Sequence, residues 1–308
     1  MLDGYYTGLM IKIMIYAIFA LSLQLLVGGV GLISLGHAAF FGIGAYATAL
    51  LSPESGAGNF FILIPLVLLF SMSYAAVTGV PALRTRGIYF IMITLAFAQM
   101  AYYVCHDTPL GGGSDGIYLY FRPEWRINGL TLLNIDTPNR FYFFVLSMLA
   151  LTWLFLTALM RSRFGAALTG IRLNEQRMCA AGYSTLTYKF AAYLLAAALA
   201  GLAGMLYAVK DGFVNPELLA WEQSGLVLLM VILGGMSRAW GAIAGAFALI
   251  LLQEIFQSER VFGVLASHWQ LTFGFSIIVL VALLPNGLAG IASILKFNAQ
   301  WKRPSPNR

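Results

Sequence analysis

The sequence predicts an all-α fold, a polytopic bundle of about eight or nine transmembrane helices. Of 308 residues, 60% are hydrophobic and only 10% are charged, whereas soluble domains carry roughly 25% charged residues. Long apolar runs separate the few charges, and glycine, with 32 residues in the chain, is abundant within those runs. Small residues let helices approach closely in lipid. We expect a single transmembrane domain over residues 1–308.

The charge-free runs set the number of expected spans. A spanning helix needs about 20 apolar residues, so the first run has room for two spans, while the two shortest runs are short for one each. The runs without Asp, Glu, Lys or Arg are 13–53, 55–83, 87–106, 141–160, 190–209, 223–237, 239–253 and 261–295.

The positions of the cations predict the orientation of the bundle. Lys and Arg are densest in the segments 161–189 and 296–308, and Arg84 with Arg86 forms a smaller cluster. Cytoplasmic loops of membrane proteins carry an excess of Lys and Arg. We therefore expect 161–189 to be a cytoplasmic loop, 296–308 a cytoplasmic tail and 107–139 an external, periplasmic loop. A net charge of +6 is explained by this orientation and does not call for a nucleic-acid partner.

Glycines cluster in the otherwise apolar stretch 28–51. Each glycine weakens a helix by roughly 1 kcal/mol relative to alanine, so a broken or re-entrant helix is expected there. A continuous helix with small packing faces is the alternative.

His37 lies in this stretch beside Ser34, where its imidazole could bond freed backbone carbonyls or contact a polar substrate. The pattern Gly44 to Leu51 recurs faintly from Gly245 to Leu252, a hint of internal duplication.

The loop 161–189 contains a short segment with helical periodicity. Ile171, Met178 and Ala181 share one face, and Gly182 is suited to end the helix. This predicts an amphipathic helix beneath the membrane that docks in a groove of a soluble partner. A helix lying flat on anionic lipid headgroups is the other interpretation.

Motifs for catalysis and for metal binding are missing from the sequence. Gly112 to Gly116 spell a nucleophile elbow, but an external loop between two spans does not offer the strand-to-helix turn that the elbow needs. The three histidines are dispersed, and Cys105 and Cys179 are expected on opposite sides of the membrane as free thiols. There is also no phosphate-binding P-loop, so ATP-driven transport would need a separate nucleotide-binding subunit.

The segment 107–139 combines mixed charge with several aromatic residues. Aromatic residues near the ends of spans usually form an interfacial belt. A docking surface for an external partner is the second interpretation, and its candidate residues are Ser114, Asp115 and Glu124.

Several motifs together resemble the LivM-type permeases of branched-chain amino acid ABC importers. They run in order from about residue 10 to 290. The motifs are the runs Ser34 to Tyr46, Arg86 to Phe90 with Thr94 to Ala98, Gly112 to Gly116, Ser162 to Gly165, Ala180 to Gly182, Ala200 to Tyr207 and Leu233 to Gly235.

The resemblance implies a non-catalytic permease subunit in a bacterial inner membrane. Its implied partners are a second, LivH-type permease, two cytoplasmic LivG/LivF-type ATPases and a periplasmic binding protein, within membrane lipid. ATP and Mg would bind to the ATPases, so no cofactor is expected in this chain. The loop 161–189 would contact the ATPases through Arg172, Asn174, Glu175, Arg177, Ala180, Ala181 and Gly182.

The implied function is half of a translocation pathway for leucine, isoleucine, valine or a related amino acid. Related permeases serve urea, amides or aromatic acids, and an autonomous channel or ion-coupled transporter is an alternative of a different class. Polar backbone in broken helices would carry the zwitterion. The residues expected along the path are Ser34, His37, Gly42, Gly44, Thr94, Gly234 and Gly235.

Overall fold

The computed structural model describes residues 2–53, 56–127, 130–133, 137–236, 238–258, 268–284 and 287–290. Within this part of the chain, seven helices are long and apolar enough to cross a membrane, and two shorter apolar helices accompany them. The protein is thus a multi-pass membrane protein, and the total agrees with the expected eight or nine spans. The expected tail 296–308 lies outside the described residues.

The membrane helices run in the following order. They are α1 Leu2–Gln24, continued by the π-helical segment η1 Leu25–Val30; α2 His37–Leu51; α3 Phe60–Ala82; α4 Ile88–Asp107; α5 Pro138–Arg161; α8 Thr185–Asp211; α9 Trp221–Gly234; α10 Ala239–Gln257; and α12 Trp269–Leu283. The short elements α6 Arg163–Leu173, α7 Glu175–Ala180, η2 Pro109–Gly111, η3 Gly113–Asp115 and η4 Pro216–Leu219 connect them.

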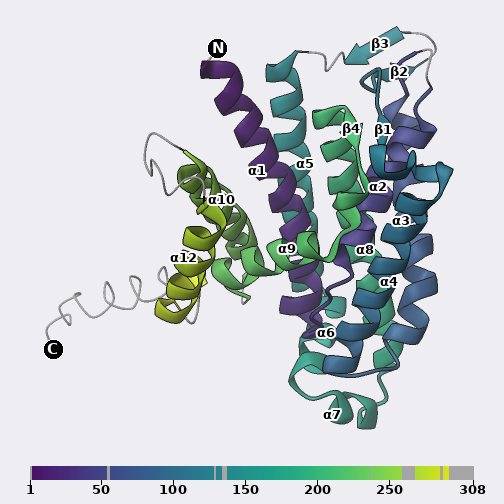
Figure 1. Cartoon of the computed structure of the whole chain (residues 1–308). Coiled ribbons are helices and arrows are strands. Elements are labelled where there is room, and N and C mark those ends of the chain that lie inside the picture. Colours follow the sequence, from purple (N-terminus) through teal and green to yellow (C-terminus); the bar gives the residue numbers. More distant parts are fainter. Residues whose placement is uncertain are drawn as a thin grey trace, which may run out of the picture.

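Helix α1 stands at the centre of the bundle. In its apolar window 94% of the residues are buried, against 22% in α4 and in α5. It contacts α5, α8, α9 and α10, while α2 packs between α8 and α3. Figure 1 shows α3 and α4 on one side of this centre and α10 with α12 on the other. The outer helices therefore present apolar faces to lipid or to another protein.

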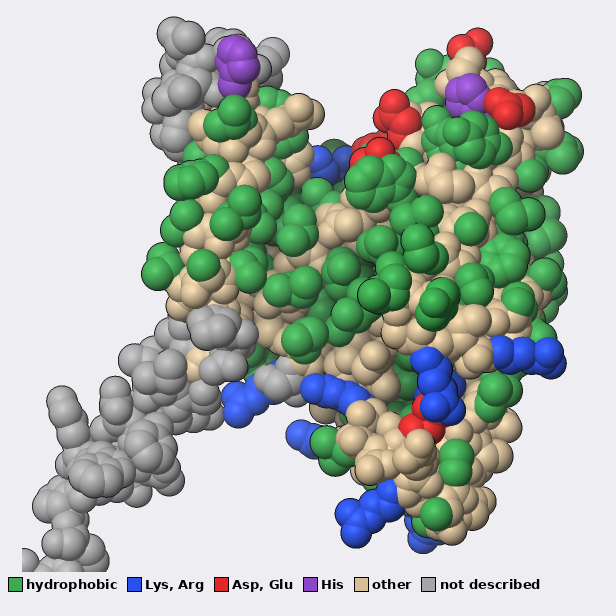
Figure 2. All heavy atoms as spheres, turned by 60° about the horizontal axis from the view of Figure 1, so that its bottom comes forward, with side chains coloured by type: hydrophobic (Ala, Val, Ile, Leu, Met, Phe, Trp, Pro, Cys, Tyr) green, Lys and Arg blue, Asp and Glu red, His purple; other side chains and the backbone are tan. Residues whose placement is uncertain are grey.

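The two ends of the bundle differ in charge. One end, called the basic end below, carries the α3–α4 turn, α6, α7 and the α9–α10 turn. Its described cations are Arg84, Arg86, Arg161, Arg163, Arg172, Arg177, Lys189 and Arg238, with Glu175 as the acid among them. Figure 2 shows Lys and Arg gathered at this end, below a broad hydrophobic band, and most Asp and Glu at the opposite end.

The opposite end carries the expected external loop. The start of α1 lies there too, because the Tyr5 hydroxyl bonds Glu254 near the end of α10. Four short strands, which the sequence did not predict, form two antiparallel pairs: β1 Ile117–Tyr118 with β4 Phe213–Val214, and β2 Trp125–Ile127 with β3 Leu130–Leu133.

The expected loop 161–189 is shorter in the structure. Helix α8 begins at Thr185, so residues 185–189 belong to a membrane helix. Lys189 is consequently buried, with 8% of its surface exposed. Lys189 is therefore a buried residue of α8 and does not belong to the exposed loop.

Candidate coupling site and helix breaks

The connection between α5 and α8 folds as two helices joined at a corner. The expected single helix through Ile171 and Ala181 is interrupted at Asn174, whose backbone is extended (φ −158°). The Asn174 side-chain oxygen accepts a hydrogen bond from the Arg177 amide at 2.9 Å, which caps α7. Asn174 thus builds the corner, and its side chain is engaged within the chain.

The end of α7 agrees with the sequence prediction. Gly182 has φ +87°, and its amide bonds the Cys179 carbonyl at 3.0 Å while the Tyr183 amide bonds the Met178 carbonyl at 3.1 Å. This pair of bonds is a Schellman motif, in which the left-handed position favours glycine. Gly182 therefore stops the helix, as expected.

Glu175 ties α7 to two other elements. Its carboxylate lies 2.6 Å from the Lys189 ammonium of α8 and accepts a hydrogen bond from Thr185 at 3.2 Å. Its other oxygen lies 3.8 Å from Arg86 in the α3–α4 turn. We call Glu175, Lys189, Thr185 and Arg86 the clasp. The clasp therefore connects α7 with α8 and with the α3–α4 turn.

The clasp also sets the pKa of Glu175. Desolvation by partial burial acts to raise this pKa, but the hydrogen bond from Lys189, the charges of Lys189 and Arg86 and the Thr185 hydroxyl outweigh it. The net result is a pKa lowered from the ordinary glutamate value. Glu175 is therefore ionised at neutral pH.

Arg172 connects α6 to the end of the first span. Its guanidinium donates a hydrogen bond to the Gly28 carbonyl of η1. A Cβ atom placed on Gly31, where φ is +81°, would lie 3.2 Å from the Arg172 side chain. The left-handed turn at Gly31 thus packs against the Arg172 side chain, and α6 contacts the residues at which the helix ends.

Other predicted coupling residues form an open surface. Arg177, Ala180 and Ala181 are exposed, as is Leu173 at the end of α6. Figure 1 shows α6 and α7 projecting from the end of the bundle. Of the predicted contact set, Arg177, Ala180, Ala181 and Gly182 are exposed without a side-chain bond that ties them to another element, while Arg172, Asn174 and Glu175 use theirs within the chain.

The Gly-rich stretch 28–51 contains a break, which is one of the two interpretations that its glycines allowed. The π-helical η1 ends at Gly31, and α2 starts only at His37, leaving 31–36 unwound; we call 31–36 the first break. Ser34 is fully buried there and accepts a hydrogen bond from the Gly36 amide at 3.2 Å. Ser224 of α9 caps the first turn of α2 by accepting from the Ala38 amide at 2.8 Å. Polar side chains thus satisfy backbone groups inside the bundle.

His37 starts α2 and is fully buried. The Ser22 hydroxyl donates to the Phe19 carbonyl at 2.6 Å, and its oxygen lies 2.8 Å from His37 Nε2. Since the hydroxyl proton is used, Nε2 carries the proton and donates to Ser22. His37 Nδ1 is then an acceptor, and it has no hydrogen-bond partner among the described residues.

The other residues predicted along the path lie at close contacts between helices. A Cβ atom on Gly42 would collide with Leu219 of η4, and one on Gly44 with the Gly201 backbone of α8. Thr94 is buried and its hydroxyl bonds the Ile91 carbonyl at 2.9 Å. Its own carbonyl lies against Gly36. Close helix packing therefore explains Gly42 and Gly44, and Thr94 lies beside the first break.

A second break separates α9 from α10. Gly235 there has φ +99°, and Gly234 lies directly against the backbone of Gly241. The second break is tied to the first helix, because the Gln24 amide at the end of α1 donates to the Met236 carbonyl at 2.7 Å.

The predicted docking residues lie apart from this basic-end machinery. Ser114 and Asp115 are exposed in η3, joined by a 3.3 Å hydrogen bond. Glu124 is half-buried, and its backbone pairs with Gly58 and Phe60. All three lie at the end opposite α6 and α7.

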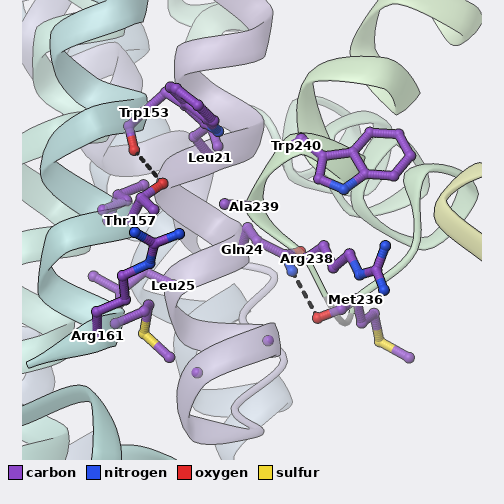
Figure 3. A pocket seen from close by; sticks show the side chains of 14 residues that line it. Leu21, Gln24, Leu25, Trp153, Thr157, Arg161, Met236, Arg238, Ala239 and Trp240 are labelled. Atoms are coloured by element: carbon purple, nitrogen blue, oxygen red, sulfur yellow. Dashed lines mark hydrogen bonds between the residues drawn. The ribbon is translucent and has the colours of Figure 1, made fainter.

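A cavity of about 370 Å³ lies between η1 and the second break. Helix α1 and η1 contribute Leu21, Gln24 and Gly28, and the remaining wall comes from the basic-end half of α5 and the α9–α10 turn. Figure 3 shows Arg161 and Arg238 on either side of Gln24. The predicted path residues do not line this cavity.

Several residues of these sites were missed by sequence reasoning. Ser22, Gln24 and Ser224 are polar residues inside or at the edge of apolar runs, a signal that marks functional positions in membranes. Lys189 and Arg86, which pair with Glu175, were used in the sequence analysis only to predict the orientation in the membrane. They lie 14 and 89 residues from Glu175 in the sequence, and such separations do not predict an ion pair.

The spans and the charge difference between the two ends define a multi-pass membrane protein. The chain belongs to the family described as branched-chain amino acid transport system / permease component, whose model matches residues 5–284. It is 33% identical over 271 residues to the high-affinity branched-chain amino acid transport system permease protein LivM of Salmonella typhimurium. It is 31% identical over 271 residues to the protein of the same name from Escherichia coli.

These two alignments cover 82% of this chain and 64% of each relative, so the chain spans less than two thirds of their length. A probable branched-chain amino acid transport permease protein LivM of Methanocaldococcus jannaschii is 23% identical over 258 residues, covering 77% of this chain and 72% of that protein. No solved structure matches the chain significantly.

Proposed function

We propose that this chain is a permease subunit of an ATP-driven importer in a bacterial inner membrane, with leucine, isoleucine, valine or a related amino acid as its substrate. The observation that carries this proposal is the family match over residues 5–284. The names of the relatives support the substrate class. Two cytoplasmic ATPases would hydrolyse ATP, with Mg, so this chain acts as a non-catalytic subunit.

The basic end faces the cytoplasm in this proposal, because cations concentrate on that side of membrane proteins. The ATPases contact the exposed surface of α6 and α7 around Arg177, Ala180 and Ala181. The binding protein docks at the opposite end, near Ser114, Asp115 and Glu124. A second, homologous permease completes the pathway.

The contacts that α6 and α7 make with the membrane helices suggest how ATP hydrolysis would drive transport. When the ATPases close, they push on this unit, and Arg172 carries the displacement to Gly28 beside the first break. The clasp carries it to α8 and to the α3–α4 turn. A two-state element of this kind can open one side while it closes the other.

The breaks suit the substrate. A zwitterion is costly to move through hydrocarbon unless polar groups replace its water. The first break places unwound backbone and the buried Ser34 inside the bundle, and His37 Nδ1 is an acceptor without a partner among the described residues. Substrate choice then rests mainly with the external binding protein.

Reconstitution tests the proposal. The chain is co-purified with candidate permease, ATPases and binding protein in nanodiscs, and ATP hydrolysis is measured with the binding protein loaded with leucine, phenylalanine or urea. Stimulation by the leucine-loaded protein is expected. If no loaded binding protein stimulates hydrolysis, or if the chain alone moves solute, the importer function is wrong.

A further inference from the structure

The cavity at the basic end has an unusual distribution of charge. Arg161 closes α5 and Arg238 precedes α10, and both line the cavity. Both side chains are exposed, and neither has an ion pair or a hydrogen bond within the part of the chain that the structure describes. Two unneutralised guanidinium groups beside one cavity attract an anion.

The wall between the arginines and the bundle interior is mostly apolar. It includes Leu21, Leu25 and Leu156, together with Trp153 of α5 and Trp240 of the first turn of α10. Figure 3 shows Trp153 and Leu21 at the end of the cavity away from Arg161, and Trp240 next to Arg238. Tryptophan favours the region between lipid headgroups and acyl chains, so the cavity has a cationic end and an apolar end in the order that a lipid has.

One polar atom of the wall is free: the Gln24 side-chain oxygen is buried and has no hydrogen-bond partner among the described residues. Two other polar groups of the wall are engaged. The Gln24 amide donates to the Met236 carbonyl at 2.7 Å, and the Thr157 hydroxyl donates to the Trp153 carbonyl at 2.7 Å. The lining residues include no Asp or Glu. A zwitterionic amino acid would place its ammonium group near two arginines without a carboxylate to offset the repulsion.

We propose that this cavity binds an anionic phospholipid of the leaflet at the basic end, with its phosphate between Arg161 and Arg238 and an acyl chain along Leu25 and Trp153. Basic pockets between membrane helices on the cytoplasmic side recognise such headgroups. The lipid bridges α5 and α10 across α1, and it rests on Gly28 and Gly29 next to the first break. Lipid composition therefore biases the position of both breaks.

Native mass spectrometry of the purified chain in mild detergent tests the site. The probes are phosphatidylglycerol, phosphatidylcholine and L-leucine. The chain is expected to retain phosphatidylglycerol over phosphatidylcholine. Arg161→Gln and Arg238→Gln should each weaken retention on the order of fivefold, and the double variant about 30-fold. Arg84→Gln, an exposed arginine of the same end that does not line the cavity, is the matched control and should retain the lipid.

A second measurement locates the lipid. Phosphatidylglycerol with brominated acyl chains should quench the tryptophan fluorescence, and a Trp153→Phe, Trp240→Phe variant should lose most of that quenching. Equal retention of both lipids, or retention unchanged in the double arginine variant, overturns the proposal. Displacement of the lipid by L-leucine at millimolar concentration would instead assign the cavity to substrate. Neither assay needs ATPases or transport, so failure here leaves the proposed function untouched.

Discussion

The Arg172 guanidinium donates a hydrogen bond to the Gly28 carbonyl, although the two residues are 144 positions apart in the sequence. One residue belongs to the exposed α6–α7 unit, and the other to the last turns of the most buried helix. This contact links the exposed α6–α7 unit to the helix end that precedes the first break.

Replacing Arg172 by alanine should uncouple the ATPases from transport. The variant loses a charge-assisted bond to the end of the first span, so stimulated uptake should fall about tenfold or more, while association with the ATPases persists. Uptake and co-purification in the reconstituted complex measure the two effects. Arg177→Ala is the matched control and should show the reverse pattern, with weakened association. Normal uptake by the Arg172 variant would contradict the link.

The two charges of the clasp should differ in their effect on stability. Glu175→Ala leaves the Lys189 ammonium buried without its carboxylate, whereas Lys189→Met leaves Glu175 partly exposed and close to Arg86. We expect Glu175→Ala to cost about 1–2 kcal/mol and Lys189→Met less. Thermal unfolding in detergent gives both values, with exposed Gln176→Ala as control. An equal or inverted order would refute this account of the clasp.

The clasp predicts a pH dependence. The pKa of Glu175 is lowered in the folded protein, so its stabilisation is fully present above the unfolded-state value of about 4.3 and is lost as pH falls through the folded pKa. The difference in unfolding temperature between the native chain and Glu175→Gln should be constant from pH 7 to about pH 5 and should shrink below pH 4. A difference that grows on acidification would have the wrong sign.

Ser22 should be required for the start of α2. Ser22→Ala removes the acceptor for His37 Nε2 inside the bundle, which should cost about 1–3 kcal/mol. Adding His37→Phe to that variant should recover part of the loss, because the ring is kept and no buried nitrogen remains unpaired. Unfolding of the two variants in detergent provides the comparison. No loss in the single variant would show that the Ser22–His37 bond is not stabilising.

Sequence reasoning predicted the architecture because bilayer thickness imposes the same length on every span. Charge-free runs predicted eight or nine membrane segments, and glycine density marked the stretch in which the first break lies. The corner at Asn174 was missed because helical periodicity continues across it, and only the extended backbone and the cap reveal two helices. The strands were missed because stretches of two to four residues are too short to show alternation.

The candidate site was predicted only in part, because its bonds join distant segments. Glu175 was identified as a contact for a partner, but its own partners come from α8 and from the α3–α4 turn. Gly42 and Gly44 were assigned to the path from the break pattern, yet they serve close packing. Whether a glycine lines a path or packs against a helix depends on which neighbouring helix its face contacts. Charge and residue spacing do not specify that contact.

Labelling of Cys179 tests the central claim most directly, since this exposed thiol lies on α7. In a Cys105→Ser background, a membrane-impermeant maleimide should label Cys179 in inverted vesicles but not in right-side-out vesicles, and bound ATPase subunits should suppress the labelling. Labelling from the outer side, or labelling that the ATPases leave unchanged, would contradict a cytoplasmic α6–α7 unit that the ATPases contact.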